Sequence, residues 1–462
     1  MEEIVPLKNL GDFYLEESIN KILTIIKQKG DLFRNCDIVF GNNINEPIYL
    51  NLIKEGIKLR FNSKTQRLEL IEKNFELIGN EIEYYYNNSL VFSQKNKEHI
   101  YYSSPDFNYI NSIFGLSKIP KIINDGQNIL LPYDGISFIF KNISKELESE
   151  KIEQNCPLEK MLIYSENNLI NSLNKDNSKL NNPSPLIKYS TEKENKIQIH
   201  FIKKNDNSNI TIELNESLVD VLEKMNNPNY IYPKKINENN TNELDDINCY
   251  YVNYFDYGID LLIDANNNDK IKKIILHSNN PLDTKFGIYE KCNFQIEMKS
   301  SYFQKNINFN QNIPQLNMIK LSKIKEKKYS PILEISNNYN ITINNNEKYD
   351  NNHLEEKKEL NEKEEKNTLD ILESNKIKNY FENQQIKEFN GIFQNIYIHP
   401  LTNFSCDVLE KIPSTCYSVY QHTDTKINRI YKYYLFESII FEVMENNKIS
   451  SIIFYSNKKK NL

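Results

Sequence analysis

Four segments of the chain fit one template of a short apolar strand, and the first of them alternates apolar and polar residues with the period of two that a half-buried β-strand requires. In residues 56–61, Ile57, Leu59 and Phe61 would face one side and the two basic residues between them the other. Turn residues and a second apolar run follow each segment, so the pattern predicts hairpins of antiparallel strands. The hairpins are expected over residues 56–71, 135–165, 258–278 and 438–456.

Helical periodicity precedes these hairpins. Residues 15–28 repeat apolar side chains along one face and predict an amphipathic helix, and residues 107–116 predict a shorter one. Ser217 is expected to cap a third helix, which Pro228 would end. Residues 407–412 are similar to that third helix and are also followed by a proline.

The chain also contains internal similarity. Residues 220–225 are similar to residues 407–412, and residues 270–278 are similar to residues 448–456, in the same order. The sequence therefore predicts four tandem units, each with a helix and an antiparallel β-meander. We expect an α+β fold in which these repeats form sheets covered by helices on one face.

Composition changes along the chain and divides it. An Asn-, Lys- and Glu-rich insert at residues 338–390 has too little apolar surface to offset the entropy of ordering it, so we expect most of it to be disordered. Shorter Asn-rich stretches cover residues 171–184 and 234–247. The predicted domains are the first pair of units, the third unit with the strands after it, and the fourth unit packing with the third, at residues 1–166, 185–337 and 391–457.

The overall composition excludes several classes of protein. The 462 residues are 39% hydrophobic and 11% aromatic, which is enough to form a sizeable core. No run of about 18 apolar residues occurs, so no membrane-spanning helix is expected. The acidic start of the chain argues against a secretory signal. A net charge of -6 gives no general attraction to nucleic acid or to anionic lipid.

Local signatures of enzymes are missing from the sequence. It contains no phosphate-binding loop, no nucleophile elbow and no H-E-x-x-H helix. The six cysteines form no C-x-x-C pair, and the histidines lie far apart. We therefore expect free thiols in a reducing cytosol, no cofactor, no metal site and no catalytic residues.

One group of residues could still support catalysis. Asp260, Asp264 and His277 fall in the third predicted hairpin and could form an acid–base pair with an orienting histidine. The structural interpretation is stronger, because Asp260 lies on the polar face of a strand and Asp264 begins a turn, where Asp accepts local N–H groups. A hydrolase built on these three residues stays a remote alternative.

Two further features have both a functional and a structural interpretation. The tyrosines at positions 84–86, 250, 251, 254 and 257 could stack on nucleic-acid bases, but they lack interleaved basic residues and packing between strands explains them better. A phosphoinositide head group would need clustered cations. The nearest candidates surround the first hairpin, although a solvated sheet face explains them equally well: Lys54, Lys58, Arg60, Lys64 and Arg67.

The third unit resembles a known family. Residues 253–265 follow the pattern N-Y-F-x-x-G-[VI]-D-[IL]-L-[FI]-D-A, and residues 276–281 follow L-H-[TS]-N-x-P. Residues 52–71 and 441–447 are similar to the first and last characteristic blocks of the same family. This is the phagosome assembly factor family, and the resemblance covers most of the chain outside the Asn-rich stretches.

The resemblance implies a non-enzymatic adaptor of autophagy. Such a protein acts with a WD-repeat propeller partner at the phagophore assembly site, and the propeller recognises phosphoinositides, so membrane contact is expected to be indirect. The implied location is the cytoplasm with peripheral recruitment to autophagic membranes, and Golgi association is a further implied location. The alternatives are direct phosphoinositide binding and a role in Golgi or endosomal trafficking.

Overall fold

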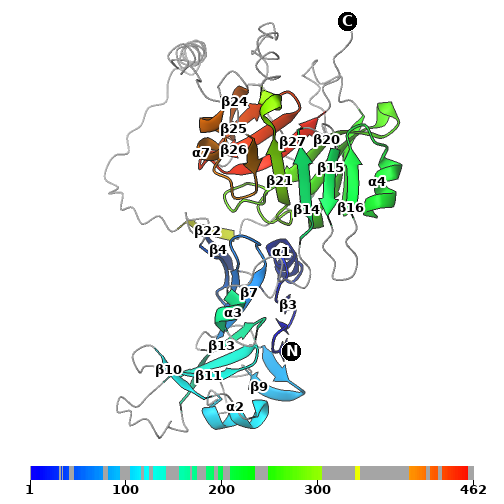
Figure 1. Cartoon of the computed structure of the whole chain (residues 1–462). Coiled ribbons are helices and arrows are strands. Elements are labelled where there is room, and N and C mark those ends of the chain that lie inside the picture. The colour runs from blue at the N-terminus through cyan, green and yellow to red at the C-terminus, as the bar shows by residue number, and fades with distance from the viewer. Residues whose placement is uncertain are drawn as a thin grey trace, which may run out of the picture.

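The chain folds into two lobes, each with its own hydrophobic core (Figure 1). This computed structural model describes residues 2–30, 33, 35–40, 46–75, 82–93, 105–115, 119–123, 128–141, 156–166, 169–173, 184–191, 196–200, 209–234, 248–303, 339–343, 395–412, 417–424 and 429–455. The N-terminal lobe comprises the described residues up to 173 together with residues 339–343, which add a strand to its larger sheet. The C-terminal lobe comprises the described residues of 184–303 and 395–455.

The N-terminal lobe contains two sheets. A nine-stranded sheet has the order β10-β11-β12-β13-β7-β6-β5-β4-β22, and a five-stranded sheet has the order β3-β2-β1-β8-β9. The strands are β1 (Glu2–Val5), β2 (Asn9–Leu10), β3 (Phe13–Tyr14), β4 (Cys36–Phe40), β5 (Ile48–Leu52), β6 (Ile57–Phe61), β7 (Leu68–Asn74), β8 (Glu83–Tyr86), β9 (Ser89–Ser93), β10 (Lys121–Ile123), β11 (Asn128–Tyr133), β12 (Ile136–Lys141), β13 (Leu158–Tyr164) and β22 (Tyr339–Ile343). The helices are α1 (Ile19–Gln28), α2 (Phe107–Phe114) and α3 (Leu169–Leu173).

The C-terminal lobe also contains two sheets. An eight-stranded sheet has the order β17-β18-β19-β20-β27-β26-β25-β24, and a five-stranded sheet has the order β16-β15-β14-β21-β23. The strands are β14 (Leu186–Ser190), β15 (Lys196–His200), β16 (Asn209–Glu213), β17 (Tyr230–Pro233), β18 (Cys249–Tyr254), β19 (Ile259–Asp264), β20 (Lys270–His277), β21 (Asn293–Met298), β23 (Ile396–Ile398), β24 (Ser418–Asp424), β25 (Arg429–Leu435), β26 (Ile439–Met444) and β27 (Ile449–Tyr455). The helical segments are α4 (Leu218–Met225), η3 (Phe255–Tyr257), η4 (Ala265–Asn267), α7 (Phe404–Asp407) and η6 (Leu409–Lys411).

Each large sheet contains two four-stranded meanders that meet through their last strands, and in the N-terminal lobe β22 is the ninth strand. The pairs β7–β13 and β20–β27 make these central contacts. The four predicted hairpins are present as the final two strands of the meanders, and each contains one register shift: β6–β7, β12–β13, β19–β20 and β26–β27. The four meanders therefore have the same strand order and the same irregularity.

A local two-fold relation connects the meanders within the C-terminal lobe. Ile275 pairs with Ile453, and on either side of them Leu276 pairs with Ile452 and Ile274 pairs with Phe454. Ile275 thus pairs with its own counterpart, Ile453, and the residues on either side pair with the counterparts of their opposite neighbours. Because antiparallel strands related in this way bury the same apolar positions, a single pattern can form both halves of the sheet.

In each hairpin, a backbone hydrogen bond links the residue just before the first strand to the end of the second strand. The carbonyl of Gly258 accepts a hydrogen bond from the N–H of His277 at 2.9 Å, and Gly56, Gly135 and Ser438 accept from the corresponding strand ends. Gly258 has a φ of +67°, and an added Cβ would lie 2.6 Å from the carbonyl oxygen of Glu290. Glycine is therefore required there both for its conformation and for the close approach of another segment.

The helices are short, and their caps explain where they begin. The helix predicted over residues 15–28 begins only at Ile19, because the Ser18 hydroxyl accepts from the N–H of Lys21. Ser217 caps α4 as predicted. The segment expected to be the counterpart of α4, residues 407–412, begins at the last residue of α7 and forms only the short η6.

The predicted α+β fold with helices covering one face of each sheet is wrong, because most of the ordered structure is β-strand. In the C-terminal lobe, the apolar face of the large sheet packs against the five-stranded sheet: the rings of Tyr189 and Phe454 lie 4.4 Å apart across the core. The strands β14, β15 and β21 were not predicted, although β15 and β21 alternate apolar and polar residues. A strand pattern shows which face is buried but not which element covers it, and here a second sheet does so.

Much of the sequence outside the lobes lies beyond the described residues. Of the insert at 338–390, only β22 is described, and it pairs in parallel with β4. Apart from β22, the insert whose disorder was predicted, and the Asn-rich residues 174–183 and 235–247, lie outside the described residues. No helix within the described part of the chain is long and apolar enough to cross a membrane.

Candidate functional site

A loop of residues 278–292, here called the connecting loop, lies between the two lobes. It follows β20, and its residues Leu282 and Phe286 pack against the core of the N-terminal lobe. On its other side, the hydroxyl of Ser450 donates to Asp283, and the N–H of Thr284 reaches the hydroxyl of Tyr431. The same loop therefore contacts both lobes.

Buried amide groups join the loop to the N-terminal lobe. The side-chain amide of Gln66 donates to the carbonyl oxygen of Asn279 at 2.8 Å, and the side chain of Asn279 donates back to Gln66 at 2.8 Å. The side chain of Asn20 in α1 donates to the carbonyl oxygen of Ile288. A buried polar group without a partner is costly, so this reciprocal pairing fixes the position of the loop.

An ion pair lies beside these amides. Arg67 donates to the Glu290 carboxylate at 2.7 Å, and also to the Ser184 hydroxyl and to the carbonyl oxygen of Glu16. Burial raises the pKa of Glu290, although Arg67 and Lys21 oppose that effect. Because both partners are buried, loss of either one would leave an unpaired polar or charged group at the junction.

A polar cluster lies under the connecting loop on the outer face of β18, β19 and β20. The Asp260 carboxylate accepts hydrogen bonds from His277 Nε2 at 2.9 Å, from the Tyr289 hydroxyl at 2.6 Å and from the Asn253 amide. The imidazole of His277 stacks on the ring of Tyr289 with centroids 3.9 Å apart. The loop thus supplies the side chain that covers the histidine.

The cluster holds Asp260 in its ionised form. Burial alone would raise the pKa of this carboxyl, but His277 and the three hydrogen bonds lower it below its ordinary value. Burial and the adjacent Asp260 raise the pKa of Tyr289. Asp260 and His277 are each only 4% exposed, so the pair has the hydrogen bond of a general acid–base pair but lies buried beneath Tyr289.

Asp264, the third residue of the predicted constellation, lies elsewhere. It is at the far end of β19, where it pairs with Lys270, and its carboxylate accepts the N–H of Asn266. Asp260 pairs with Ile275, near the opposite end of the hairpin. The structure therefore brings Asp260 and His277 together and leaves Asp264 as a turn residue, which agrees with the structural interpretation of that aspartate.

Comparison with known proteins identifies the family. The sequence profile of Phagosome assembly factor 1 matches residues 9–455. This chain belongs to the phagosome assembly factor 1 family. The resemblance seen in the third unit is thereby confirmed, and its L-H-[TS]-N-x-P segment contains His277 and Asn279, the residues that join the polar cluster to the lobe junction.

Individual relatives agree with this assignment. A PHAF1 protein of Drosophila melanogaster is 25% identical over 336 residues, which cover 65% of this chain and 75% of that protein. A PHAF1 protein of Caenorhabditis elegans is 26% identical over 342 residues, covering 63% and 76%. A PHAF1 protein of Arabidopsis thaliana is 30% identical over 112 residues, covering 23% and 27%. No solved structure matches.

In this family member, the predicted basic cluster does not form one free surface. Arg67 is buried in the ion pair with Glu290, and Arg60 pairs with Glu69 at 2.9 Å. Lys58 is exposed and lies over the ring of Tyr49, with 4.2 Å between its amine and the ring centroid. Lys54 and Lys64 are also exposed. Both arginines are therefore engaged in ion pairs within the protein.

The tyrosines mostly pack within the lobes. Tyr84 and Tyr254 are almost fully buried, as packing between strands predicts. Tyr251 stacks on Tyr232 of β17 with centroids 5.0 Å apart. No group of three or more residues that could hold a metal ion occurs in the described ranges.

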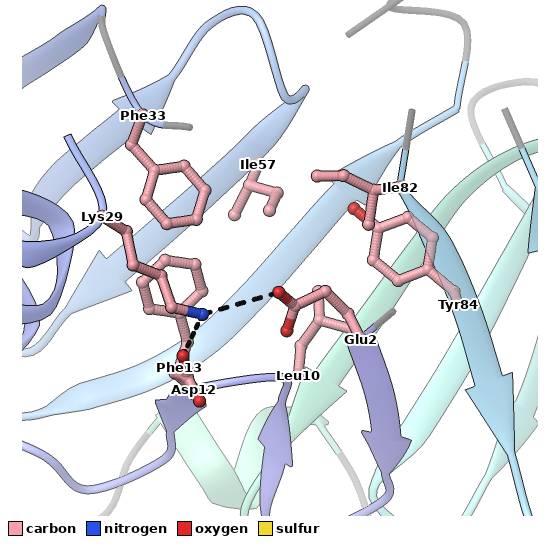
Figure 2. A pocket seen from close by; sticks show the side chains of 9 residues that line it. All are labelled: Glu2, Leu10, Asp12, Phe13, Lys29, Phe33, Ile57, Ile82 and Tyr84. Carbon is pink, nitrogen blue, oxygen red and sulfur yellow. Dashed lines mark ion pairs between the residues drawn. The ribbon is translucent and has the colours of Figure 1, made fainter. Parts of the chain in front are cut away.

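One small cavity lies near the N-terminus, between α1 and the strands (Figure 2). The amine of Lys29 points toward the carboxylates of Asp12 and Glu2, and the Tyr84 ring closes another side. The cavity has room for roughly one water molecule. It is too small for a substrate or cofactor, and the buried Tyr84 hydroxyl, which has no hydrogen-bond partner, fits a bound water.

Sequence reasoning missed the partners that complete the junction. Tyr289 and Glu290 have no periodic or motif signal of their own, and Gln66 was marked only as part of the block at residues 52–71 that resembles the family. The available clue was the position of Asn279 and His277 in one family segment, because residues so close in the chain often share a structural task. The structure shows that this task is to join a strand end to the connecting loop.

Proposed function

We propose that this protein is a non-enzymatic adaptor of autophagy that acts with a WD-repeat propeller partner at the phagophore assembly site. Family membership supports the coarser part of this proposal, a role in phagosome assembly. The non-enzymatic part is supported by the burial of Asp260 and His277 beneath Tyr289. Catalysis by this pair would require the connecting loop to leave both lobes.

The observation that carries the proposal is the junction between the lobes. The Arg67–Glu290 ion pair and the Gln66–Asn279 amide pair are buried and complementary. They favour a fixed arrangement of two lobes, which can present one continuous surface to a large partner. Fixed surfaces suit binding because less conformational entropy is lost when the complex forms.

The proposed location is the cytoplasm, with peripheral recruitment to autophagic membranes through the propeller partner. Indirect recruitment is supported by the engagement of Arg60 and Arg67 in ion pairs, which leaves the first hairpin without a cluster of free arginines. Flotation of the purified chain with phosphoinositide vesicles at low salt should recover little protein. Strong recovery without a partner would favour direct lipid binding instead.

Affinity capture followed by mass spectrometry tests the proposal. The full chain should recover a WD-repeat propeller protein, and mixing the purified pair should reconstitute the complex. The conservative variant His277→Gln, if it folds, should retain the complex because the proposed role needs no imidazole chemistry. Recovery of neither a propeller nor a membrane-trafficking protein would contradict the adaptor role.

A further inference from the structure

The strand β17 forms one edge of the eight-stranded sheet, and its outer side pairs with no other described strand. The N–H of Lys234, just after β17, donates to the carbonyl oxygen of Cys249 in β18 at 2.9 Å. Hydrogen-bonded and non-hydrogen-bonded pairs alternate in an antiparallel ladder. Ile231 lies three residues before Lys234, opposite Val252, and the alternation makes this a non-hydrogen-bonded pair. Ile231 therefore directs its N–H and C=O away from β18.

Large apolar side chains are exposed along this edge. Ile231 is 51% exposed and Tyr230 is 40% exposed, and as neighbours in a strand they lie on opposite faces of the sheet. The rings of Tyr230 and Tyr232 lie 6.2 Å apart, and Tyr232 stacks on Tyr251. Apolar side chains exposed on both faces of an edge are those that an added strand would cover.

The N-terminal lobe shows an added strand on the corresponding edge. The strands β4 and β17 each begin a meander, and each follows a helix that is capped by a serine. Both capping serines form an isolated bridge to the start of the last strand of the meander. These bridges join Ser18 to Arg67 and Ser217 to Lys270. In the N-terminal lobe, β22 adds to β4 with five residues in parallel register. The β22 sequence, Y-N-I-T-I, is uncharged and has β-branched residues at its last three positions.

We propose that the edge of β17 binds an extended segment of a partner protein, which adds to the eight-stranded sheet as a further strand. The segment is uncharged and rich in β-branched or aromatic residues, as β22 is. Backbone hydrogen bonds to Ile231 provide part of the affinity, and contacts with Tyr230 and Ile231 on the two faces provide the rest. This site goes beyond the proposed adaptor role and does not depend on the partner being a propeller.

The edge itself limits the length of the added strand. Pro233 faces outward in the same register as Ile231 and has no N–H to donate. The interface on β17 is therefore only a few residues long, and we expect affinity in the micromolar range or weaker for an isolated peptide. Proline at this position also protects the free edge from pairing with long strands of other molecules.

A fluorescent peptide copying residues 336–346 is the probe for this site, because its central residues form the added strand of the other lobe. Its binding to the full chain is measured by fluorescence anisotropy. The critical variant is Ile231→Pro, which removes the outward N–H without removing a hydrogen bond between β17 and β18. We expect at least ten-fold weaker binding for Ile231→Pro and for Ile231→Asp.

Ile53→Asp is the matched control, because Ile53 is 49% exposed but lies outside any strand, in the N-terminal lobe. It should bind the peptide within two-fold of the wild-type chain, and a peptide carrying Ile341→Asp and Ile343→Asp should not bind. Hydrogen exchange at the Ile231 amide should slow when the peptide is added. The proposal is overturned if the peptide does not bind, or if wild type and a folded Ile231→Pro variant bind it equally.

Discussion

The outer face of the large sheet is covered in the C-terminal lobe but open to solvent at the corresponding positions in the N-terminal lobe. In the C-terminal lobe, Asn253 pairs with Asp260 across β18 and β19, and both are buried. In the N-terminal lobe, Asn51 pairs with Lys58 across β5 and β6 at the corresponding positions, but Lys58 is exposed and Asn51 half-buried. The strands and register are equivalent, so local structure does not cause the difference.

The connecting loop causes it. Residues 278–292 fold back over the outer face of β18–β20 and place Tyr289 against Asp260 and His277. A carboxylate that would be solvated on an open sheet becomes a buried hydrogen-bond acceptor. The comparison teaches that a polar strand position acquires its energetic importance from the segment that covers it.

The core-facing sides of the two large sheets differ the other way round, because there the N-terminal lobe is the one that buries a polar side chain. Lys73 of β7 corresponds to Leu276 of β20, because they pair with the equivalent residues Ile57 and Ile259. Leu276 packs in its core, whereas Lys73 is 1% exposed and its amine donates to the carbonyl oxygen of Glu55 at 2.6 Å. One lobe therefore buries a cation where the other buries a hydrocarbon side chain.

Substitution of Asp260 should show the largest effect. Asp260→Ala leaves the donors of His277, Tyr289 and Asn253 without their acceptor, and should cost roughly 3–5 kcal/mol of unfolding free energy. Lys58→Ala, at the corresponding exposed position, should change stability by less than about 0.5 kcal/mol. Urea unfolding measures both, and similar losses would show that the loop does not create the difference.

The lowered pKa of Asp260 gives the same comparison a pH dependence. A carboxyl whose pKa is lower in the folded state stabilises the protein above its unfolded pKa of about 4, and this contribution disappears as the pH falls through the folded value. The stability difference between wild type and Asp260→Asn should therefore shrink below about pH 4. A constant difference would argue against an ionised Asp260.

The ion pair at the lobe junction should rank second. A double-mutant cycle with Arg67→Ala and Glu290→Ala should give a coupling of about 2 kcal/mol, because both groups are buried and in contact. The exposed pair of Lys196 and Glu213 is the control, with an expected coupling of about 0.2–1 kcal/mol. Equal couplings would mean that the junction is open to solvent.

Substitution of Lys73 should have a smaller effect, and it should raise the unfolding free energy where the preceding substitutions lower it. Burial lowers its pKa to about 8, so the folded state loses roughly 3 kcal/mol when the amine is charged at pH 7. Lys73→Leu removes that cost but also a hydrogen bond worth about 1–2 kcal/mol, so a net gain of about 1–2 kcal/mol is expected.

The pH profile separates these two contributions of Lys73. Between about pH 8 and pH 10.4 the unfolded chain binds a proton that the folded chain has lost, so stability should rise with pH in the wild type relative to Lys73→Leu. Lys58→Leu, which removes an exposed lysine, should follow the wild-type profile. Parallel profiles for wild type and Lys73→Leu would contradict a buried titrating amine.

The close approach of the loop to α1 should give the smallest effect. Gly287 and Gly115 have φ values of +80° and +82°, but an added Cβ would lie 2.5 Å from Leu23 only at Gly287. Gly287→Ala should therefore cost about 1 kcal/mol more than Gly115→Ala, because the Leu23 side chain must move. Thermal unfolding of both variants measures this difference, and equal shifts would mean that the lobes separate freely there.

Particular residues show how far sequence reasoning could reach. The hairpins and the Ser217 cap were predictable, because alternation and capping are local properties. The fold class was not, because strands such as β15 and β21 alternate apolar and polar residues but carry no local sign of the sheet that they join or of the face that they cover. At the candidate site, Asp260 and His277 could be selected from the sequence, whereas Tyr289 could not, since its role arises only when the loop folds back.

The sequence by itself determined the period-two alternation, the turns and the caps, and with them the four hairpins. Only the tertiary structure decided that sheets cover sheets, that Asp260 is buried while Lys58 is not, and that Arg67 meets Glu290 across 223 positions of the chain. The reason is physical: alternation records which side of a strand avoids water, whereas the covering partner comes from a distant segment whose position depends on the packing of the whole molecule.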